Sequence, residues 1–276
     1  MAVEMLSYIE RKSPIHQLAG VTKLLCFIIW STAAMLTYDT RILLFLFVLS
    51  IVIFITSKIK IKEISFILIF ILVFLFLNNI AIYMFSPQEG VKIYGTSYIL
   101  FEIAGRYNVT VEQIFYQINI TLKYFTVTPV ALLFIVTTHP SEFAASLNKI
   151  GVSYRISYAV ALALRYIPDV QRDFRNIALA QQARGVDLSS KEKLSKRIKN
   201  AASIMIPLIL SSLDKIETIS NAMELRGFGK NKERTWYSAR PFQSRDYITL
   251  VIFVLLLIFA LVITFHDGNR FYNPFK

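Results

Sequence analysis

Long apolar runs separated by short polar segments dominate the chain. Five runs are near the length that a helix needs to cross a bilayer, at residues 21–38, 42–56, 64–85, 114–138 and 246–265. An ordinary soluble domain does not contain so many uninterrupted apolar stretches. We therefore expect an all-α polytopic membrane protein with about five transmembrane helices.

Residues 139–245 follow a different pattern, in which apolar positions recur as stripes. Val170, Phe174 and Ile177 recur at spacings of four and three, which is typical of an amphipathic helix. This pattern predicts a helix that begins at Pro168 and ends at Arg184. A second helix is expected from about Ser190 to Arg226. Three segments result: a membrane region at 1–138, a platform of amphipathic helices at 139–245, and a last membrane helix and tail at 246–276.

The two amphipathic helices end in the same pair of residues. Ala183-Arg184-Gly185 closes the first, and Leu225-Arg226-Gly227 closes the second. Glycine after the last helical residue adopts a left-handed backbone readily and stops a helix. The arginine then stands where the helix dipole favours a cation. Each end is therefore expected to present a guanidinium fork to a carboxylate on another surface.

Composition and charge support the membrane assignment and orient it. The chain is 55% hydrophobic and 17% charged, with a mean hydropathy of +0.53 and a formal net charge of +12. Residues 139–245 supply 18 of the 30 Lys and Arg but 9 of the 18 Asp and Glu. The positive-inside rule then places the N-terminus, the basic loop at 58–62 and the platform in the cytoplasm of a cell-membrane protein. The acidic loop at 86–113 falls on the other side.

The residues exclude several kinds of chemistry. The single cysteine, Cys26, and three dispersed histidines predict no metal site, and no phosphate-binding glycine loop with Lys-Ser/Thr is present. No arrangement typical of a nucleophilic enzyme is visible, and no carboxylate interrupts the five apolar runs. We therefore expect neither an enzyme nor a self-powered carrier, and no cofactor held by this chain. The basic residues at 191–199 favour anionic lipid headgroups over nucleic acid.

A few polar positions have local interpretations. Asn78 and Asn79 lie inside the third run, so we expect them to bond a neighbouring helix. Lys123 lies near one end of the fourth run, where snorkelling or a local partner is the simplest explanation. Arg11, Lys12 and Lys23 accompany an interfacial lead-in at the start of the chain, and all three are expected near lipid headgroups.

The sequence resembles the transmembrane T components of energy-coupling factor (ECF) transporters, the CbiQ-like family, along almost its whole length. The matching segments are Ser13 to Leu18 with Lys23, Thr137 to Phe143, Ala163 to Pro168, Gln182 to Gly185 and Ala222 to Gly229. The resemblance implies a membrane scaffold of an ABC-type importer for vitamins or transition-metal ions. It implies as partners two ABC ATPase subunits, which bind ATP and Mg, and a small membrane S component, which binds the substrate.

Carried over by position, Arg184 and Arg226 are the arginines that the resemblance implies to dock into acidic grooves of the ATPases. Ala183, Gly185, Leu225 and Gly227 flank them. The sequence departs from the family pattern at Leu225, where a small residue is commoner, and in the length of the 86–113 loop.

Two other interpretations stay open at this stage. Glu142 with Ala144, Ala145 and Gly151 loosely matches the coupling loop of a conventional ABC importer permease, which lines its own substrate pathway. A membrane scaffold for signalling or assembly, without transport, would need amphipathic helices alone. A second Arg-Gly helix end distinguishes the T component from the permease.

Overall fold

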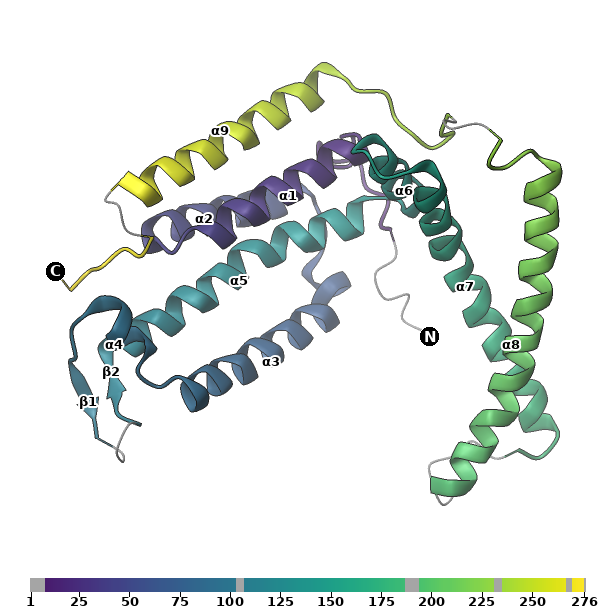
Figure 1. The fold of residues 1–276 in the computed structure, drawn as a ribbon, viewed down its shortest axis with the longest axis horizontal. Coiled ribbons are helices and arrows are strands. Elements are labelled where there is room, and N and C mark those ends of the chain that lie inside the picture. The colour runs from purple at the N-terminus through teal and green to yellow at the C-terminus, as the bar shows by residue number, and fades with distance from the viewer. Residues whose placement is uncertain (1–7, 103–106, 187–193, 231–234, 267–269, 276) are drawn as a thin grey trace. The chain divides into compact units, whose positions relative to one another are not determined.

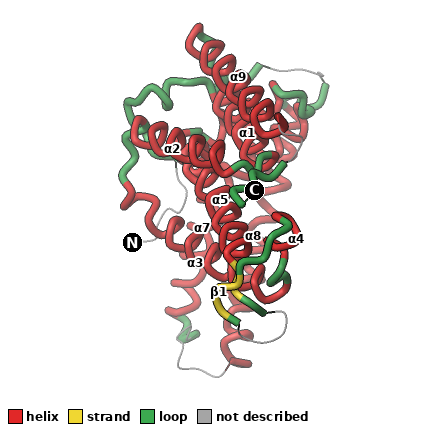
Figure 2. The backbone as a smooth tube through the Cα atoms, turned by 90° about the vertical axis from the view of Figure 1, so that its left-hand side faces the viewer, coloured by secondary structure: helices red, strands yellow, loops and turns green. Residues whose placement is uncertain are grey.

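The computed structural model describes residues 8–102, 107–186, 194–230, 235–266 and 270–275, most of them helical (Figures 1 and 2). The elements are α1 (Gly20–Leu36), α2 (Thr40–Thr56), α3 (Ile61–Phe85), α4 (Glu89–Tyr94), β1 (Ile99–Phe101), β2 (Val109–Thr110), α5 (Val111–Thr137), α6 (Pro140–Lys149), α7 (Tyr154–Ala183), α8 (Leu194–Leu225) and α9 (Ser244–His266). They form two compact units. Unit 1 holds residues 1–139 and 240–276, and unit 2 holds residues 140–239.

Unit 1 is a bundle in which the last helix packs against the first. α1 contacts both α9 and α5, and α2 packs along α5. Their shared core contains Trp30, Leu46 and Ala260, all of them almost fully buried. Residues more than 200 positions apart in sequence therefore share one core, which joins the first and last segments of the chain.

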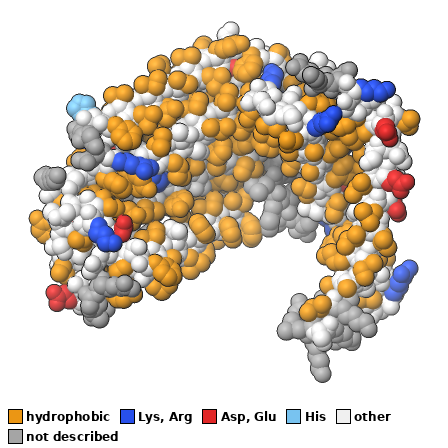
Figure 3. All heavy atoms as spheres, in the orientation of Figure 1, with side chains coloured by type: hydrophobic (Ala, Val, Ile, Leu, Met, Phe, Trp, Pro, Cys, Tyr) orange, Lys and Arg blue, Asp and Glu red, His pale blue; other side chains and the backbone are white. Residues whose placement is uncertain are grey.

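The five predicted spans all form helices, although they differ in length. Among the described helices, α3, α5 and α9 are long and apolar enough to cross a membrane, whereas α1 and α2 have 17 residues each. A 17-residue helix is about 26 Å long, slightly shorter than a hydrocarbon core of about 30 Å. Large apolar side chains cover the outer faces of these helices, as Figure 3 shows in orange. The all-α polytopic membrane fold is thus confirmed.

Asn79 and Lys123, two polar residues inside the long helices, have partners within unit 1. Asn79 donates to Thr121 of α5 at 3.0 Å and accepts at its backbone carbonyl from Gln117 at 3.1 Å, so the expected helix–helix contact is confirmed for Asn79. It is not confirmed for Asn78, whose side-chain oxygen is buried without a hydrogen-bond partner among the described residues. Lys123 is 6% exposed and donates to the Met35 carbonyl at 3.0 Å, with its Nζ 3.2 Å from the Tyr38 ring centroid. Lys123 therefore has a partner inside unit 1 and does not need to extend to the membrane surface. The partner is a carbonyl near the C-terminal end of α1, where a helix attracts cations.

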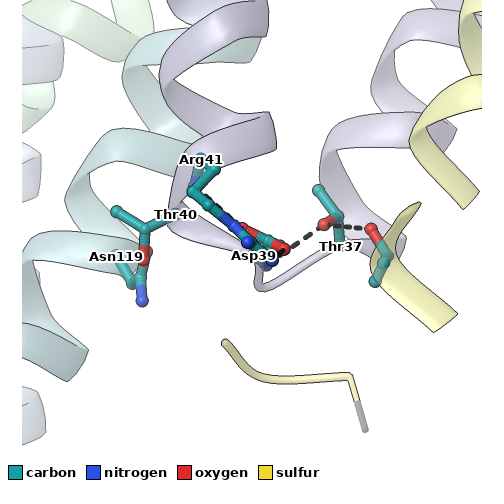
Figure 4. A network of polar contacts seen from close by, with 6 residues as sticks. Thr37, Asp39, Thr40, Arg41 and Asn119 are labelled. Carbon is teal, nitrogen blue, oxygen red and sulfur yellow. Dashed lines mark hydrogen bonds and ion pairs between the residues drawn. The ribbon is translucent and has the colours of Figure 1, made fainter. Parts of the chain in front are cut away.

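The turn between α1 and α2 is held by a chain of polar contacts (Figure 4). The Asp39 carboxylate accepts from the Arg41 backbone at 2.9 Å and pairs with its guanidinium at 2.8 Å, so it caps α2. Thr40 bonds Asn119 of α5 at 2.9 Å, and Thr37 bonds Thr264 of α9 at 2.6 Å. This one turn therefore links four helices.

Two carboxylates are buried at helix starts. Asp246, 1% exposed in the first turn of α9, accepts from the backbone N–H groups of Ala19 and Gln243 and from the Thr22 hydroxyl, each at 2.9 Å. Glu112, fully buried at the start of α5, accepts from the Tyr98 N–H at 3.0 Å. Asp246 acts as a cap of α9, whereas Glu112 joins the start of α5 to Tyr98, because the cap of α5 is the Thr110 hydroxyl. Both carboxylates are stabilised by backbone donors and by the positive end of a helix dipole.

The lead-in before α1 is folded into unit 1, and one expectation about it is wrong. Lys23 does not reach toward headgroups: it is 6% exposed and donates to the Thr137 carbonyl at 2.6 Å. The end of α5 lies beside α1, so its carbonyl offers the ammonium a closer partner than lipid does. The Ile9 N–H also donates to the Val136 carbonyl at 3.0 Å, which fixes the lead-in to the same helix end.

His16 is the centre of the lead-in and is 4% exposed. Its Nε2 lies 2.9 Å from the Ile9 carbonyl, which can only accept, so Nε2 carries the proton. Nδ1 then accepts from the Ser13 hydroxyl at 2.7 Å. Burial lowers the pKa of His16 from its usual 6.5, and the nearby cations Lys23, Arg11 and Arg240 lower it further.

Acidification is therefore expected to weaken the lead-in. The unfolded chain protonates His16 near pH 6.5, whereas the folded chain does so only at lower pH. The stability contributed by neutral His16 is complete above pH 6.5 and declines as the pH falls below it. Thermal unfolding between about pH 8 and about pH 5 should show this decline. The fall in melting temperature with pH should be shallower in His16→Gln than in the unchanged protein, and in the control His266→Gln it should equal that of the unchanged protein. The same pH dependence in all three proteins would contradict the role of neutral His16.

Candidate functional site

The first candidate end belongs to a longer helix than the sequence pattern predicts. α7 runs without interruption over Tyr154–Ala183, with Pro168 inside it. The predicted start at Pro168 is therefore wrong. Proline removes one backbone donor and can bend a helix, but residues that favour helix on both sides carry α7 through the position. Arg184 consequently stands at the end of a 30-residue rod.

Arg184 is the C-cap residue of α7, and the backbone around it closes in a defined motif. Gly185 has a φ of +83°. Its N–H donates to the Gln182 carbonyl at 2.9 Å, and the Val186 N–H donates to the Gln181 carbonyl at 3.0 Å. This pair of bonds is a Schellman motif, which requires a left-handed residue directly after the cap. The expected role of Gly185 as the stop of this helix is confirmed.

Arg226 ends α8 in the same way. Gly227 has a φ of +66°. The Gly227 N–H donates to the Glu224 carbonyl and the Phe228 N–H donates to the Met223 carbonyl, each at 2.9 Å. Both arginines therefore occupy the same position of the same motif, and the repeat in the sequence is also a repeat in backbone geometry. The predicted start of α8 near Ser190 lies outside the described residues, as do the side chains of the basic cluster at 191–199.

Both ends present their side chains to the outside. Arg184 and Arg226 are exposed, as are Ala183 and Gly185. Leu225 is 90% exposed, whereas Gly227 is half-buried. An exposed leucine directly before an exposed arginine forms a small apolar surface with a cation at its edge, which is typical of a docking element.

The two ends lie at opposite ends of the α7–α8 pair. The Phe228 ring, two residues after Arg226, packs against Tyr154 and Tyr158 in the first turns of α7, with ring centroids 5.7 and 4.8 Å apart. Arg184 closes the other end of α7. Thirty residues of helix span about 45 Å, so one partner groove is too short to receive both arginines.

Polar contacts hold the pair between its ends. Lys215 of α8 forms an ion pair with Asp173 of α7. The Gln181 amide of α7 donates to the Ser203 carbonyl of α8 at 3.1 Å. These contacts lie in the middle and toward the Arg184 end of α7, so a force applied to one helix is transmitted to the other.

The aromatic support of the Arg226 end was not anticipated from the sequence. Trp236 packs against Tyr154 with ring centroids 5.6 Å apart, and its indole donates to Asn148 of α6 at 3.1 Å. Phe228 joins the same cluster. One feature of the sequence could have indicated this cluster: Phe228 directly follows Gly227. A hydrophobic residue at that position commonly makes a contact that accompanies a Schellman motif.

The residues of α6 that resemble the coupling loop of a conventional permease are not exposed as such a loop would be. Ala144 is fully buried, Ala145 is 2% exposed and Glu142 is 6% exposed. α6 packs against α7. A loop that docks into an ATPase must present its side chains, so this segment does not present the expected surface.

Apolar side chains remain exposed along α8. Ile206, Ile209, Leu213 and Ile216 are each more than half exposed. In Figure 3 the hydrophobic side chains of α8 gather on one side and the charged ones on the other. Among the described residues there is no cluster of His, Cys, Asp or Glu that could hold a metal ion. The exposed apolar side chains of α8 are suited to contacts with protein or lipid.

Comparisons with known proteins match the chain to one protein family. The family model CbiQ, described as "Cobalt transport protein", matches residues 11–237. The chain is 27% identical to the energy-coupling factor transporter transmembrane protein EcfT of Streptococcus equi subsp. equi over 269 residues, or 91% of this chain and 93% of the relative. It is 28% identical to the protein of the same name from Staphylococcus aureus over 178 residues, 61% of this chain and 65% of the relative. That last match covers just under two thirds of the relative's length.

Proposed function

Because the chain belongs to the CbiQ family, we propose that it is the membrane scaffold of an ECF importer, which couples ATP hydrolysis by separate subunits to substrate uptake. The substrate, a vitamin or a transition-metal ion, is bound by a separate small membrane S component. ATP and Mg are bound by two ABC ATPase subunits. This chain supplies the two docking ends, at Arg184 and Arg226.

The observation that carries the proposal is the repeated helix end. Two exposed arginines occupy the same position of two Schellman motifs, about 45 Å apart along α7. A single partner with one acidic groove does not need such a duplication, whereas two related subunits with one groove each do. Closure of the two subunits would then move the two ends relative to one another.

The proposed orientation places unit 2, the N-terminus and the loop at 58–62 in the cytoplasm. The support is the charge balance, since residues 139–245 supply +9 of the net charge of +12. ATP is available on that side. Labelling of single cysteines in a Cys26→Ala background, introduced at Lys60 and at Lys92, would test it: an impermeant thiol reagent added to intact cells should modify the Lys92→Cys variant alone.

Purification of the tagged chain from its native membrane tests the function. We expect two ABC ATPase subunits and one small membrane protein to copurify, and ATP-dependent uptake of the S component's substrate to be lost when this chain is deleted. Recovery of a soluble extracellular binding protein instead would favour the conventional permease. ATP-dependent uptake that persists after deletion would reject the coupling role.

A further inference from the structure

A cavity of about 330 Å³ lies within unit 1, apart from the helix ends described above. It is about ten times the volume that a water molecule occupies in the liquid, and it falls in the range of small-molecule sites. Its walls come from the start of α1, the end of α2, the end of α5, the start of α9 and the lead-in. All of these segments meet at one end of the bundle.

Most of the wall is apolar. Phe27, Val130, Leu133 and Phe253 line it and belong to or pack against the cores of unit 1. A cavity with such walls favours a flexible hydrocarbon over a polar solute. No Asp or Glu is found among the described residues that line it.

The charged residues on the wall are cations. Lys23 and Arg245 both line the cavity and both carry a positive charge. Arg245 is exposed, and one of its guanidinium nitrogens bonds the Gln17 side chain, which also lines the cavity. A guanidinium has five N–H donors, so this bond leaves donors for a further oxygen ligand.

Thr137 adds an independent indication of a ligand. It lines the cavity and is 1% exposed, yet its hydroxyl has no hydrogen-bond partner among the described residues. A buried hydroxyl without a partner costs roughly 1 to 3 kcal/mol, so such groups are normally satisfied by water or a ligand.

We propose that this cavity binds an anionic phospholipid. One acyl chain lies against Phe27 and Phe253, and the headgroup phosphate meets the Arg245 guanidinium, with the Thr137 hydroxyl close by. The Lys23 ammonium stays bonded to the Thr137 carbonyl and contributes only its positive charge to the wall. Phosphate is well matched to an arginine fork, and a membrane protein has this ligand at high local concentration. The binding site does not depend on the docking role of Arg184 and Arg226.

Photo-crosslinking of the full chain in phospholipid vesicles tests the proposal. Phosphatidylglycerol and phosphatidylcholine, each with the same diazirine-bearing acyl chain, are compared, and the labelled peptides are mapped. We expect phosphatidylglycerol to label the segments around Phe27, Val130 and Phe253 in preference to phosphatidylcholine. Arg245→Gln should reduce this preference about fivefold, since one cation near a membrane surface contributes about 1 kcal/mol.

Two further variants make the result decisive. Lys92→Gln removes an exposed cation from α4, at the other end of unit 1, and should leave the preference unchanged. Thr249→Leu narrows the cavity without removing a charge and should reduce labelling by both lipids, while the melting temperature of the protein is maintained. Equal labelling by the two lipids, an unchanged preference in Arg245→Gln, or labelling of these segments no stronger than that of α3 would each overturn the proposal.

Discussion

Replacing both Arg184 and Arg226 with glutamate is expected to release the two ATPase subunits from the purified complex. Loss of one member of a desolvated charge pair costs about 2 to 5 kcal/mol, and a reversed charge adds repulsion from the acidic groove that we propose on each ATPase subunit. Each end should therefore bind at least about 30-fold more weakly. Subunit stoichiometry after size-exclusion chromatography measures the effect.

Single variants and a matched control separate docking from folding. Arg184→Glu and Arg226→Glu should each weaken one contact, because the two ends lie at opposite ends of the α7–α8 pair. Arg175→Glu reverses an exposed charge on the same helix away from its end and should leave the complex intact. Unchanged stoichiometry in the double variant would show that the ATPases bind elsewhere.

The second large effect is expected on stability, from Asp246→Ala. This change leaves the N–H groups of Ala19 and Gln243 and the Thr22 hydroxyl without their common acceptor. Each abandoned buried donor costs about 1 kcal/mol or more, so the free energy of unfolding should fall by about 3 kcal/mol. Chemical denaturation of the full chain in detergent micelles measures it.

Two variants test whether the effect comes from this bond set. Asp246→Asn keeps one carbonyl acceptor and should lose about half as much stability. Asp214→Asn changes an exposed carboxylate on α8 and should have little effect. A loss equal to that of the Asp214 variant would mean that Asp246 does not join α9 to α1.

The membrane helices and the two Arg-Gly helix ends were predictable because their signals are local. An apolar run of sufficient length specifies a helix in lipid without information about its neighbours. Gly185 and Gly227 likewise determine their backbone within a few residues, and both adopt the positive φ that a Schellman motif requires. These features depend on short stretches of sequence, so a single sequence contains them.

The contacts that join distant segments were not predictable. Asp246 was only the first residue of the last predicted span, and two of its three partners, Ala19 and Thr22, lie more than 220 residues away. Lys23 was assigned to headgroups because no periodicity shows that the end of α5 lies beside it. At Pro168 a local preference for a helix start was outweighed by the helical stripe on both sides. Tertiary packing decided the first two cases, and a single sequence does not show it, whereas Pro168 was decided by the helix preference of the residues around it.

The aromatic cluster next to Arg226 gives the protein an intrinsic optical probe. The chain has two tryptophans, one in each unit: Trp30 is fully buried in unit 1, and Trp236 is half-buried among Tyr154, Tyr158 and Phe228. Indole emission depends on the polarity and the ring contacts around it. A Trp30→Phe chain would therefore emit from Trp236 alone, so that movement of the Arg226 end, which we propose to dock onto an ATPase subunit, could be followed in real time without attaching a dye.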